Sequence, residues 1–194
     1  MDEPVQIIRR DATTSPGKAN AFAMIVGLPL AIIAWFLFQM RWGYASTEGL
    51  FEWIRQNAIL AALAVFVGLL LHEALHVVGW ALFGKLPLKD FEFGFNAKAL
   101  MPYAHVRNPM RLQPYRWGAA LPGLLLGVLP LLIGFIAGDG RWFVFGLAFT
   151  LAALGDALIL WLVRKEKPSV WVEDHPFDPG CVILEEKIEV SNDA

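Results

Sequence analysis

Four apolar stretches in this 194-residue chain are each long enough to cross a membrane as a helix, and they limit the available folds more than any other feature. A helix rises 1.5 Å per residue, so about 20 residues cross a hydrocarbon layer of about 30 Å. Within hydrocarbon, a single spanning segment satisfies its backbone hydrogen bonds only as a helix. We therefore predict an α-helical integral membrane protein with four transmembrane helices, over residues 19–40, 58–83, 117–137 and 142–163.

Composition supports this class and argues against others. Hydrophobic residues make up 57% of the chain, above the average of soluble domains, and eight tryptophans suit the interface between membrane and water. A net charge of -2 without a basic block argues against a nucleic-acid partner, so membrane lipid is the expected surrounding. The single cysteine, Cys181, cannot form an intramolecular disulfide.

Basic residues predict the orientation of the chain. Residues 1–18 form a polar N-terminal segment, residues 19–163 the membrane domain, and residues 164–194 a polar tail. Of the 16 Lys and Arg residues, 13 lie in the N-terminal segment, the connector after the second span, or the tail. Because such residues concentrate on the cytoplasmic side, both termini and that connector are expected in the cytoplasm. The expected location is a bacterial or archaeal cell membrane.

The connector after the second span differs from the other two. Residues 84–116 show an alternation at Phe91, Phe93 and Phe95, with a turn signal from Gly94 to Ala97. We predict a β-hairpin or a pair of short strands at the cytoplasmic face of the membrane. Such a strand could bind an extended peptide by β-augmentation, or it could be an ordinary interfacial hairpin.

The second span contains the motif HEALH, which places ionisable groups where hydrocarbon makes them costly. His72 and His76 are one helical turn apart on one face, so both imidazoles could ligate a single Zn²⁺. Glu73 lies about 100° around the helix and could reach a water on the metal without being a ligand. The alternative is a pair of core histidines that bind neighbouring helices.

Asp156 is the remaining ionisable residue in the four predicted spans. It lies eight residues before Arg164, and His76 lies nine before Lys85. Both are therefore about 12–14 Å from the cytoplasmic ends of their helices. Ionisable groups in a membrane usually pair with one another, so we predict Asp156 as a third zinc ligand; two carboxylates also neutralise Zn²⁺. The alternative is a packing aspartate bonded to a hydroxyl such as that of Thr150.

Three protein ligands leave one position on zinc open, which is the catalytic pattern. The metal would activate water and polarise a carbonyl, while Glu73 would move the proton to the leaving amine. The predicted function is zinc-dependent intramembrane hydrolysis of peptide bonds in a membrane-protein or peptide substrate. The alternative is a non-proteolytic membrane scaffold or metal-handling protein with the same site. The nearest candidates for a second oxyanion donor are Asn96, His105 and Arg107.

Three segments carry a resemblance to a known family: HEALH in the second span, LGDALIL in the last, and DHPFDPGC in the tail. Across residues 67–181 they resemble the membrane zincin peptidases, a family of unknown function that is distantly similar in plan to site-2 proteases. The resemblance implies zinc at His72, His76 and Asp156, with Glu73 as the catalytic carboxylate. Site-2 proteases carry Asn-Pro ahead of the aspartate, whereas this chain has ALGDAL.

Overall fold

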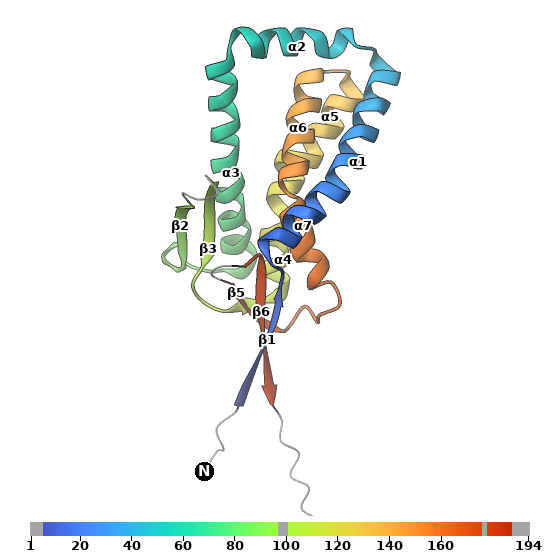
Figure 1. The fold of residues 1–194 in the computed structure, drawn as a ribbon. Coiled ribbons are helices and arrows are strands. Elements are labelled where there is room, and N and C mark those ends of the chain that lie inside the picture. Colours follow the sequence, from blue (N-terminus) through green and yellow to red (C-terminus); the bar gives the residue numbers. More distant parts are fainter. Residues whose placement is uncertain (1–5, 97–100, 176–177, 188–194) are drawn as a thin grey trace, which may run out of the picture.

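The computed structural model describes residues 6–96, 101–175 and 178–187, and it is mostly helical. In these residues, three helical segments are long and apolar enough to cross a membrane, and a bent pair of helices could form a fourth span. The prediction of a helical membrane protein is confirmed at this level (Figure 1). The segments are α1 (Pro16–Trp42), α3 (Ala58–Gly84), the run from Leu112 to Ala137, and the pair α6 (Gly140–Ala152) and α7 (Leu154–Leu162).

A proline changes the winding of the third segment. It consists of α4 (Leu112–Pro122), the π-helical turn η2 (Gly123–Val128) and α5 (Leu129–Ala137). Pro122 has no backbone N–H, so the regular ladder of helical hydrogen bonds is interrupted there, and the wider π turn follows directly. A Cβ added at Gly127 in this turn would lie 2.8 Å from a backbone atom of Thr150 on α6. The turn and α6 therefore pack backbone to backbone.

The fourth segment is broken. The sequence predicts one span over residues 142–163, whereas α6 and α7 are bent by 42° at the junction around Ala153. The break places Asp156 in the first turn of α7. Unpaired N–H groups and the positive end of the helix dipole lie at a first turn, so this position favours a carboxylate.

A short helix, α2 (Ala45–Gln56), joins α1 to α3 across one end of the molecule (Figure 1). The sequence indicates only a polar connector here, with a possible helix start from Ser46 to Gly49. The helix is amphipathic: Glu52 pairs with Arg55 at 2.7 Å on one side, and Trp53 lies on another. This pattern is typical of a helix that lies flat in a membrane interface.

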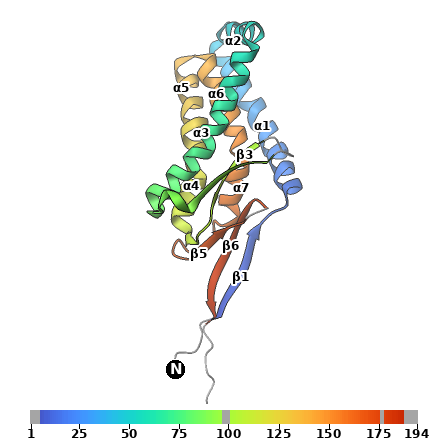
Figure 2. The ribbon, with the colours of Figure 1, turned by 90° about the vertical axis from the view of Figure 1, so that its left-hand side faces the viewer.

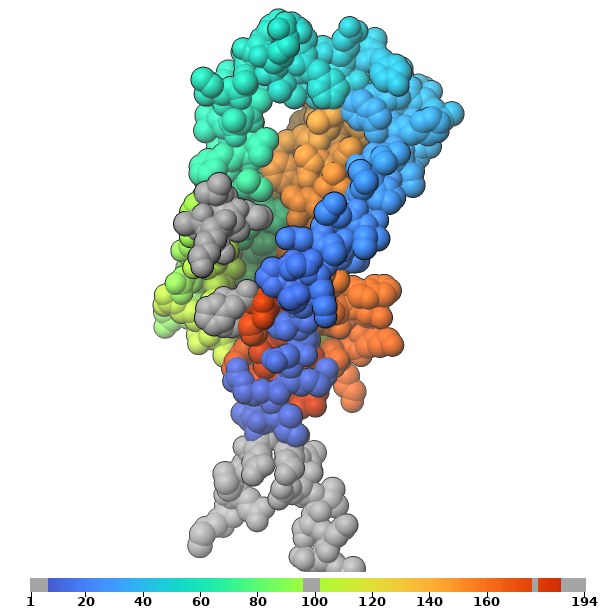
Figure 3. Space-filling view, in the orientation of Figure 1, coloured from blue at the N-terminus to red at the C-terminus, as the bar shows by residue number. Residues whose placement is uncertain are grey.

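The N-terminal part of α3 stands apart from the other helices. Ile59 is 85% exposed, and its apolar neighbours as far as Val67 are exposed on nearly every side. Packing begins at Gly68, where an added Cβ would lie 2.2 Å from the ring of Phe149 on α6. Figure 3 shows the opening that results beneath α2. The protein therefore holds mainly the C-terminal half of α3, which carries the HEALH motif.

The strand pair predicted between the second and third segments is present. β2 (Phe91–Asn96) pairs antiparallel with β3 (Met101–Val106). Gly94, from the expected turn signal, lies inside β2, and the ring of Tyr103 occupies the space that a Cβ would need there. The end of that signal, Ala97, lies outside the described residues. The hairpin is therefore longer at its tip than the sequence predicts.

A four-stranded antiparallel sheet joins the two ends of the chain, and the sequence does not predict it. The N-terminal segment pairs with the tail, from Gln6 opposite Lys187 to Thr13 opposite Gly180. The strands β1 (Gln6–Thr13) and β6 (Gly180–Lys187) therefore lie together at the end of the molecule opposite α2, where they project beyond the helices (Figures 1 and 2). The strands lie in the order β1 (Gln6–Thr13), β6 (Gly180–Lys187), β5 (Trp171–Asp174) and β4 (Met110–Arg111), and the remaining short helix is the 3-10 turn η1 (Leu88–Asp90).

The largest buried cluster lies where α3, α4 and the sheet meet. The Trp80 ring of α3 stacks between Tyr115 of α4 and Phe91 of β2, with centroid distances of 6.0 and 6.3 Å. Val172 and Ile183 from the sheet are completely buried in the same cluster. This cluster fixes the C-terminal half of α3 against the sheet and the hairpin.

The helices α3 and α4 approach each other closely at a pair of glycines. A Cβ added at Gly79 would lie 2.6 Å from the Cα of Gly118. Membrane helices gain little from the hydrophobic effect between them, so contacts between small residues contribute much of their association. The Gly79–Gly118 contact therefore holds the motif-bearing part of α3 against α4.

We expect the substitution Gly79→Val to lower the free energy of unfolding by about 1–3 kcal/mol, because the new side chain forces two backbones apart. Unfolding of the purified protein in detergent, followed by circular dichroism, measures this change. Gly49→Ala is the matched control, since nothing lies within 4 Å of a Cβ at that helical position. Equal stability of the two variants would contradict the close α3–α4 contact.

Candidate metal site

The two histidines of the HEALH motif share one buried face of α3. His72 and His76 are each 7% exposed, and their ring centroids are 5.0 Å apart. A continuous helix over Ala58–Gly84 produces this arrangement, since residues four apart lie one above the other. Two imidazoles are therefore held side by side inside the protein, as a shared metal ion requires.

The orientation of His76 depends on a backbone carbonyl of α4. His76 Nδ1 lies 3.0 Å from the carbonyl oxygen of Gly118. Because a carbonyl only accepts, Nδ1 carries the proton and donates it, which leaves Nε2 with the lone pair when the ring is neutral. Pro122, four residues after Gly118, has no N–H to offer that carbonyl, so the carbonyl is available to His76. Gly118 was not predicted from the sequence as a partner of His76. The signal that could have found it is Pro122, four residues later in the same helix, which leaves the Gly118 carbonyl without its usual helical donor.

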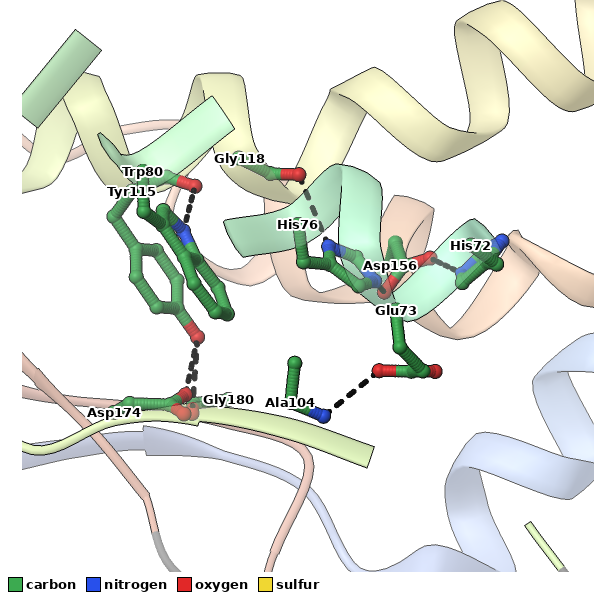
Figure 4. A network of polar contacts seen from close by, with 10 residues as sticks. All are labelled: His72, Glu73, His76, Trp80, Ala104, Tyr115, Gly118, Asp156, Asp174 and Gly180. Atoms are coloured by element: carbon green, nitrogen blue, oxygen red, sulfur yellow. Dashed lines mark hydrogen bonds and ion pairs between the residues drawn. The ribbon is translucent and has the colours of Figure 1, made fainter. Parts of the chain in front are cut away.

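Asp156 reaches both imidazoles from α7. Its Oδ2 lies 3.1 Å from His72 Nε2, and its Oδ1 lies 3.5 Å from His76 Nε2 (Figure 4). The Asp156 side chain is 18% exposed, so it is largely shielded from the surroundings. Two groups from α3 and one from α7 thus meet, although Asp156 lies 80 residues after His76 in the chain.

The donor set fits a zinc ion. Tetrahedral zinc with bonds of about 2.0–2.1 Å has ligand atoms about 3.3–3.4 Å apart. Each oxygen of Asp156 lies near this distance from one imidazole nitrogen, Oδ2 from that of His72 and Oδ1 from that of His76. With the proton of His76 on Nδ1, the lone pair of Nε2 faces a carboxylate oxygen at 3.5 Å. A lone pair and a carboxylate oxygen repel each other at this distance unless a cation lies between them or the imidazole gains a second proton. His72, His76 and Asp156 are therefore suitable zinc ligands.

Glu73 occupies a different position from these three residues. A ring nitrogen of His72, a ring nitrogen of His76 and a carboxylate oxygen of Glu73 lie within 4.8 Å of one another, and this spacing could hold a metal ion. Asp156 is closer to the imidazoles, whereas Glu73 Oε2 accepts a hydrogen bond of 2.8 Å from the Ala104 N–H of β3. Figure 4 shows the Glu73 carboxylate directed to Ala104. This contact holds Glu73 beside the imidazoles, and Asp156 is the better placed ligand.

Other candidates named from the sequence lie elsewhere. Asn96 is the last residue of β2, and the side chains of His105 and Arg107 bind Asp174 and Glu92. The contacts of His105 and Arg107 direct these two side chains to Asp174 and Glu92 rather than to the imidazoles, and the side chain of Asn96 lies outside the described part of the structure.

Two further polar groups bear on the alternatives. The hydroxyl of Thr150 is buried without a hydrogen-bond partner among the described residues, so it does not bind Asp156 as the packing alternative required. Cys181 of β6 is completely buried, and burial raises the pKa of its thiol to about 12. Cys181 is therefore a packing residue rather than a nucleophile.

The fold and the site define a helical membrane protein with an HExxH motif on one of its spanning helices. Residues 65–171 match the model of a protein family that is described as "Putative zincin peptidase". This match covers more than half of the chain, so the protein belongs to that family, and the resemblance seen in the sequence is confirmed. A search of curated proteins and a search of solved structures each found no match.

We expect the purified protein to bind about one zinc ion per chain and the double variant His72→Ala, His76→Ala to bind none. A ligand at 100 times its Kd stabilises a folded protein by about 2.7 kcal/mol, so a chelator should also lower the Tm of the wild type. Metal analysis after size exclusion in detergent gives the stoichiometry. His175→Ala, in the tail, is the control and should keep its zinc. A metal-free wild type that still folds would contradict a zinc site.

Proposed function

We propose that this protein is a zinc-dependent intramembrane endopeptidase that hydrolyses peptide bonds of membrane-associated substrates. The observation that supports this most is the convergence of Asp156 on both imidazoles of the HEALH motif. Two histidines and one carboxylate are a ligand set of catalytic zinc sites, in which one metal position stays open to water or substrate. Membership of a zincin peptidase family supports the same reaction class.

The ligands in this proposal are His72, His76 and Asp156. Zinc held by them supplies a Lewis acid that polarises the scissile carbonyl and activates water. The Gly118 carbonyl fixes the ring of His76, so that its Nε2 stays directed to the metal position. Asp156 lies in the first turn of α7, where the positive end of the helix dipole favours a negative charge.

Glu73 is the general base in this proposal. Its carboxylate takes one proton from the attacking water, and the oxygen of that water forms the new bond to the carbonyl carbon. Glu73 then gives the proton to the amide nitrogen as the C–N bond breaks, which releases a free amine and a carboxylic acid; the acid passes its remaining proton to the amine or to water. The Ala104 N–H holds Glu73 beside the imidazoles while leaving its second oxygen available for water.

The outer edge of β3 is the proposed binding place for the peptide. Arg107 N–H donates to Asp90 O at 2.9 Å, so odd-numbered residues of β3 direct their backbone groups to β2. Even-numbered residues direct theirs to the other edge, as the Ala104 N–H shows by reaching Glu73. Because Pro102 has no N–H and the Ala104 N–H is used by Glu73, this edge would bind a peptide mainly through the carbonyl groups of these residues. An extended peptide paired along it would pass beside Glu73.

The proposed setting is a cell membrane with both termini in the cytoplasm. The described ends of β1 and β6 lie together at one end of the molecule, as an arrangement with both termini on one side requires. The basic residues concentrated in the N-terminal segment, the hairpin connector and the tail support the cytoplasmic side. The partners in this proposal are membrane lipid and a membrane-protein or peptide substrate.

Asp156→Ala should weaken zinc binding by more than the roughly 10–100-fold that loss of an outer-shell partner costs, because a direct ligand is removed. Competition with a chromogenic zinc chelator measures the affinity. Asp139→Ala, at the cap of α6, is the matched aspartate control and should bind zinc like the wild type. Equal affinities in the two variants would exclude Asp156 from the ligand set.

Glu73→Gln should keep its zinc and lose cleavage by about 10²–10⁴-fold, because an amide cannot take the proton of water. Single-span test peptides in proteoliposomes, analysed by mass spectrometry, report cleavage directly. The variant must first show the same zinc content as the wild type. If it cleaves as the wild type does, or if its function in cells is intact while His72→Ala abolishes it, the scaffold or metal-handling alternative is favoured.

A further inference from the structure

A second cluster of polar side chains lies between the hairpin and the sheet, outside the metal site. His105 Nδ1 of β3 lies 2.7 Å from Asp174 Oδ2 of β5. The other oxygen of Asp174 accepts a hydrogen bond of 3.1 Å from the hydroxyl of Tyr115, which also reaches the Gly180 carbonyl at 3.2 Å (Figure 4). The carboxylate of Asp174 is thus held on both sides, and the proposed peptidase chemistry uses none of these groups.

The hairpin is anchored firmly at its base and weakly farther along. At the base, Phe91 and Val106 are 9% and 2% exposed, within the large core cluster. Farther along, Phe93, Phe95 and Tyr103 are each more than 40% exposed. Ala104, the β3 residue at the metal site, is only partly buried against that cluster, so polar contacts also contribute to its position.

Two consecutive residues of β3 provide those contacts. The Ala104 N–H donates to Glu73 on α3, and the His105 side chain binds Asp174 on β5. A shift of β3 by even one residue would remove both contacts at once, because neighbouring residues alternate in direction. The pair formed by His105 and Asp174 therefore fixes the register of β3 relative to Glu73.

The charges around His105 favour its protonated form. Its hydrogen bond to Asp174 raises the pKa of the imidazole, while burial lowers it. The charge of Asp174 and that of Glu92, opposite on β2, raise it further, whereas Arg107 lowers it. From α4, the hydroxyl of Tyr115 binds the same carboxylate as His105. Since His105 and Asp174 are only 23% and 14% exposed, solvent screens this ion pair less than a surface pair.

We propose that His105 is a positioning residue that fastens β3 to Asp174 of the sheet and so holds the outer edge of β3 in register with Glu73. This inference rests on the proposed function, since it gives the substrate peptide a β3 edge to pair with. It extends that function by making the sheet, built from both ends of the chain, part of the machinery that positions the substrate.

The dependence on pH follows from the direction of the shift. A group whose pKa is raised by folding contributes stability that is complete below its ordinary pKa, about 6.5 for histidine. That contribution is lost as the pH rises through the raised pKa. The hairpin is therefore held more firmly in mild acid and less firmly above that window.

Hydrogen exchange of the full-length protein in nanodiscs, followed by mass spectrometry, tests the proposal. In Asp174→Asn, exchange across β3 should rise about ten-fold, the effect expected for loss of a charge-assisted hydrogen bond, while the second half of α3 stays protected. Glu185→Gln is the matched control, because it breaks an exposed ion pair with Arg10 in the same sheet as Asp174 and should leave β3 protected. Unchanged exchange in Asp174→Asn, or an equal rise in α3 and β3, would overturn the proposal.

His105→Gln provides a second, milder test. Glutamine carries no charge but can donate a hydrogen bond to the carboxylate of Asp174, so β3 should stay protected from exchange. Because glutamine does not titrate, this protection should no longer fall as the pH rises. This comparison is made after the intrinsic pH dependence of amide exchange is divided out. A pH step that persists in His105→Gln would overturn the assignment to His105. The readout needs neither zinc nor cleavage, so its failure is distinguishable from failure of the proposed peptidase function.

Discussion

The contact of one carboxylate with two imidazoles across separate helices is the interaction on which the rest of this structure depends. Asp156, His72 and His76 would each be costly alone in an apolar bundle, and their convergence removes that cost only if all three are held in place. Their supports come from different elements. The break between α6 and α7 turns Asp156 toward α3, and the Gly118 carbonyl fixes His76. Irregular helices are therefore a requirement of this site.

The polar layer at one end of the molecule extends this logic beyond the helices. The hairpin contacts Glu73 through Ala104, and the sheet contacts the hairpin through Asp174. Tyr115 links both to α4, whose next turn supports His76. Residues that lie far apart along the chain are thus connected by one continuous network of hydrogen bonds and packing contacts. In the proposed function, the helices supply the metal ligands, while the strands position the substrate.

Much of the candidate site could be predicted from the sequence, because charge in a hydrophobic segment is rare and informative. The HEALH motif and Asp156 were found in this way, and the structure places them together, although their roles as ligands and base stay predictions. The alternation of Phe91, Phe93 and Phe95 predicted the hairpin correctly. The four-stranded sheet was missed, because pairing of β1 with β6 depends on contacts across nearly the whole chain. The helix break at Ala153 was missed because no proline marks it.

The pairing of β1 with β6 also limits the order in which the molecule can be completed. β1 precedes the candidate membrane spans in the chain and its partner β6 follows them, so β1 stays unpaired while these helices are synthesised. Long-range pairings of this kind form late in folding, since the closure of a large loop precedes any gain. Asp174 belongs to the same late segment. A nascent chain would therefore contain the proposed metal ligands before it contains Asp174 of β5, which binds the hairpin. The proposed peptide-binding edge of β3 would thus take its final position after the metal site has formed.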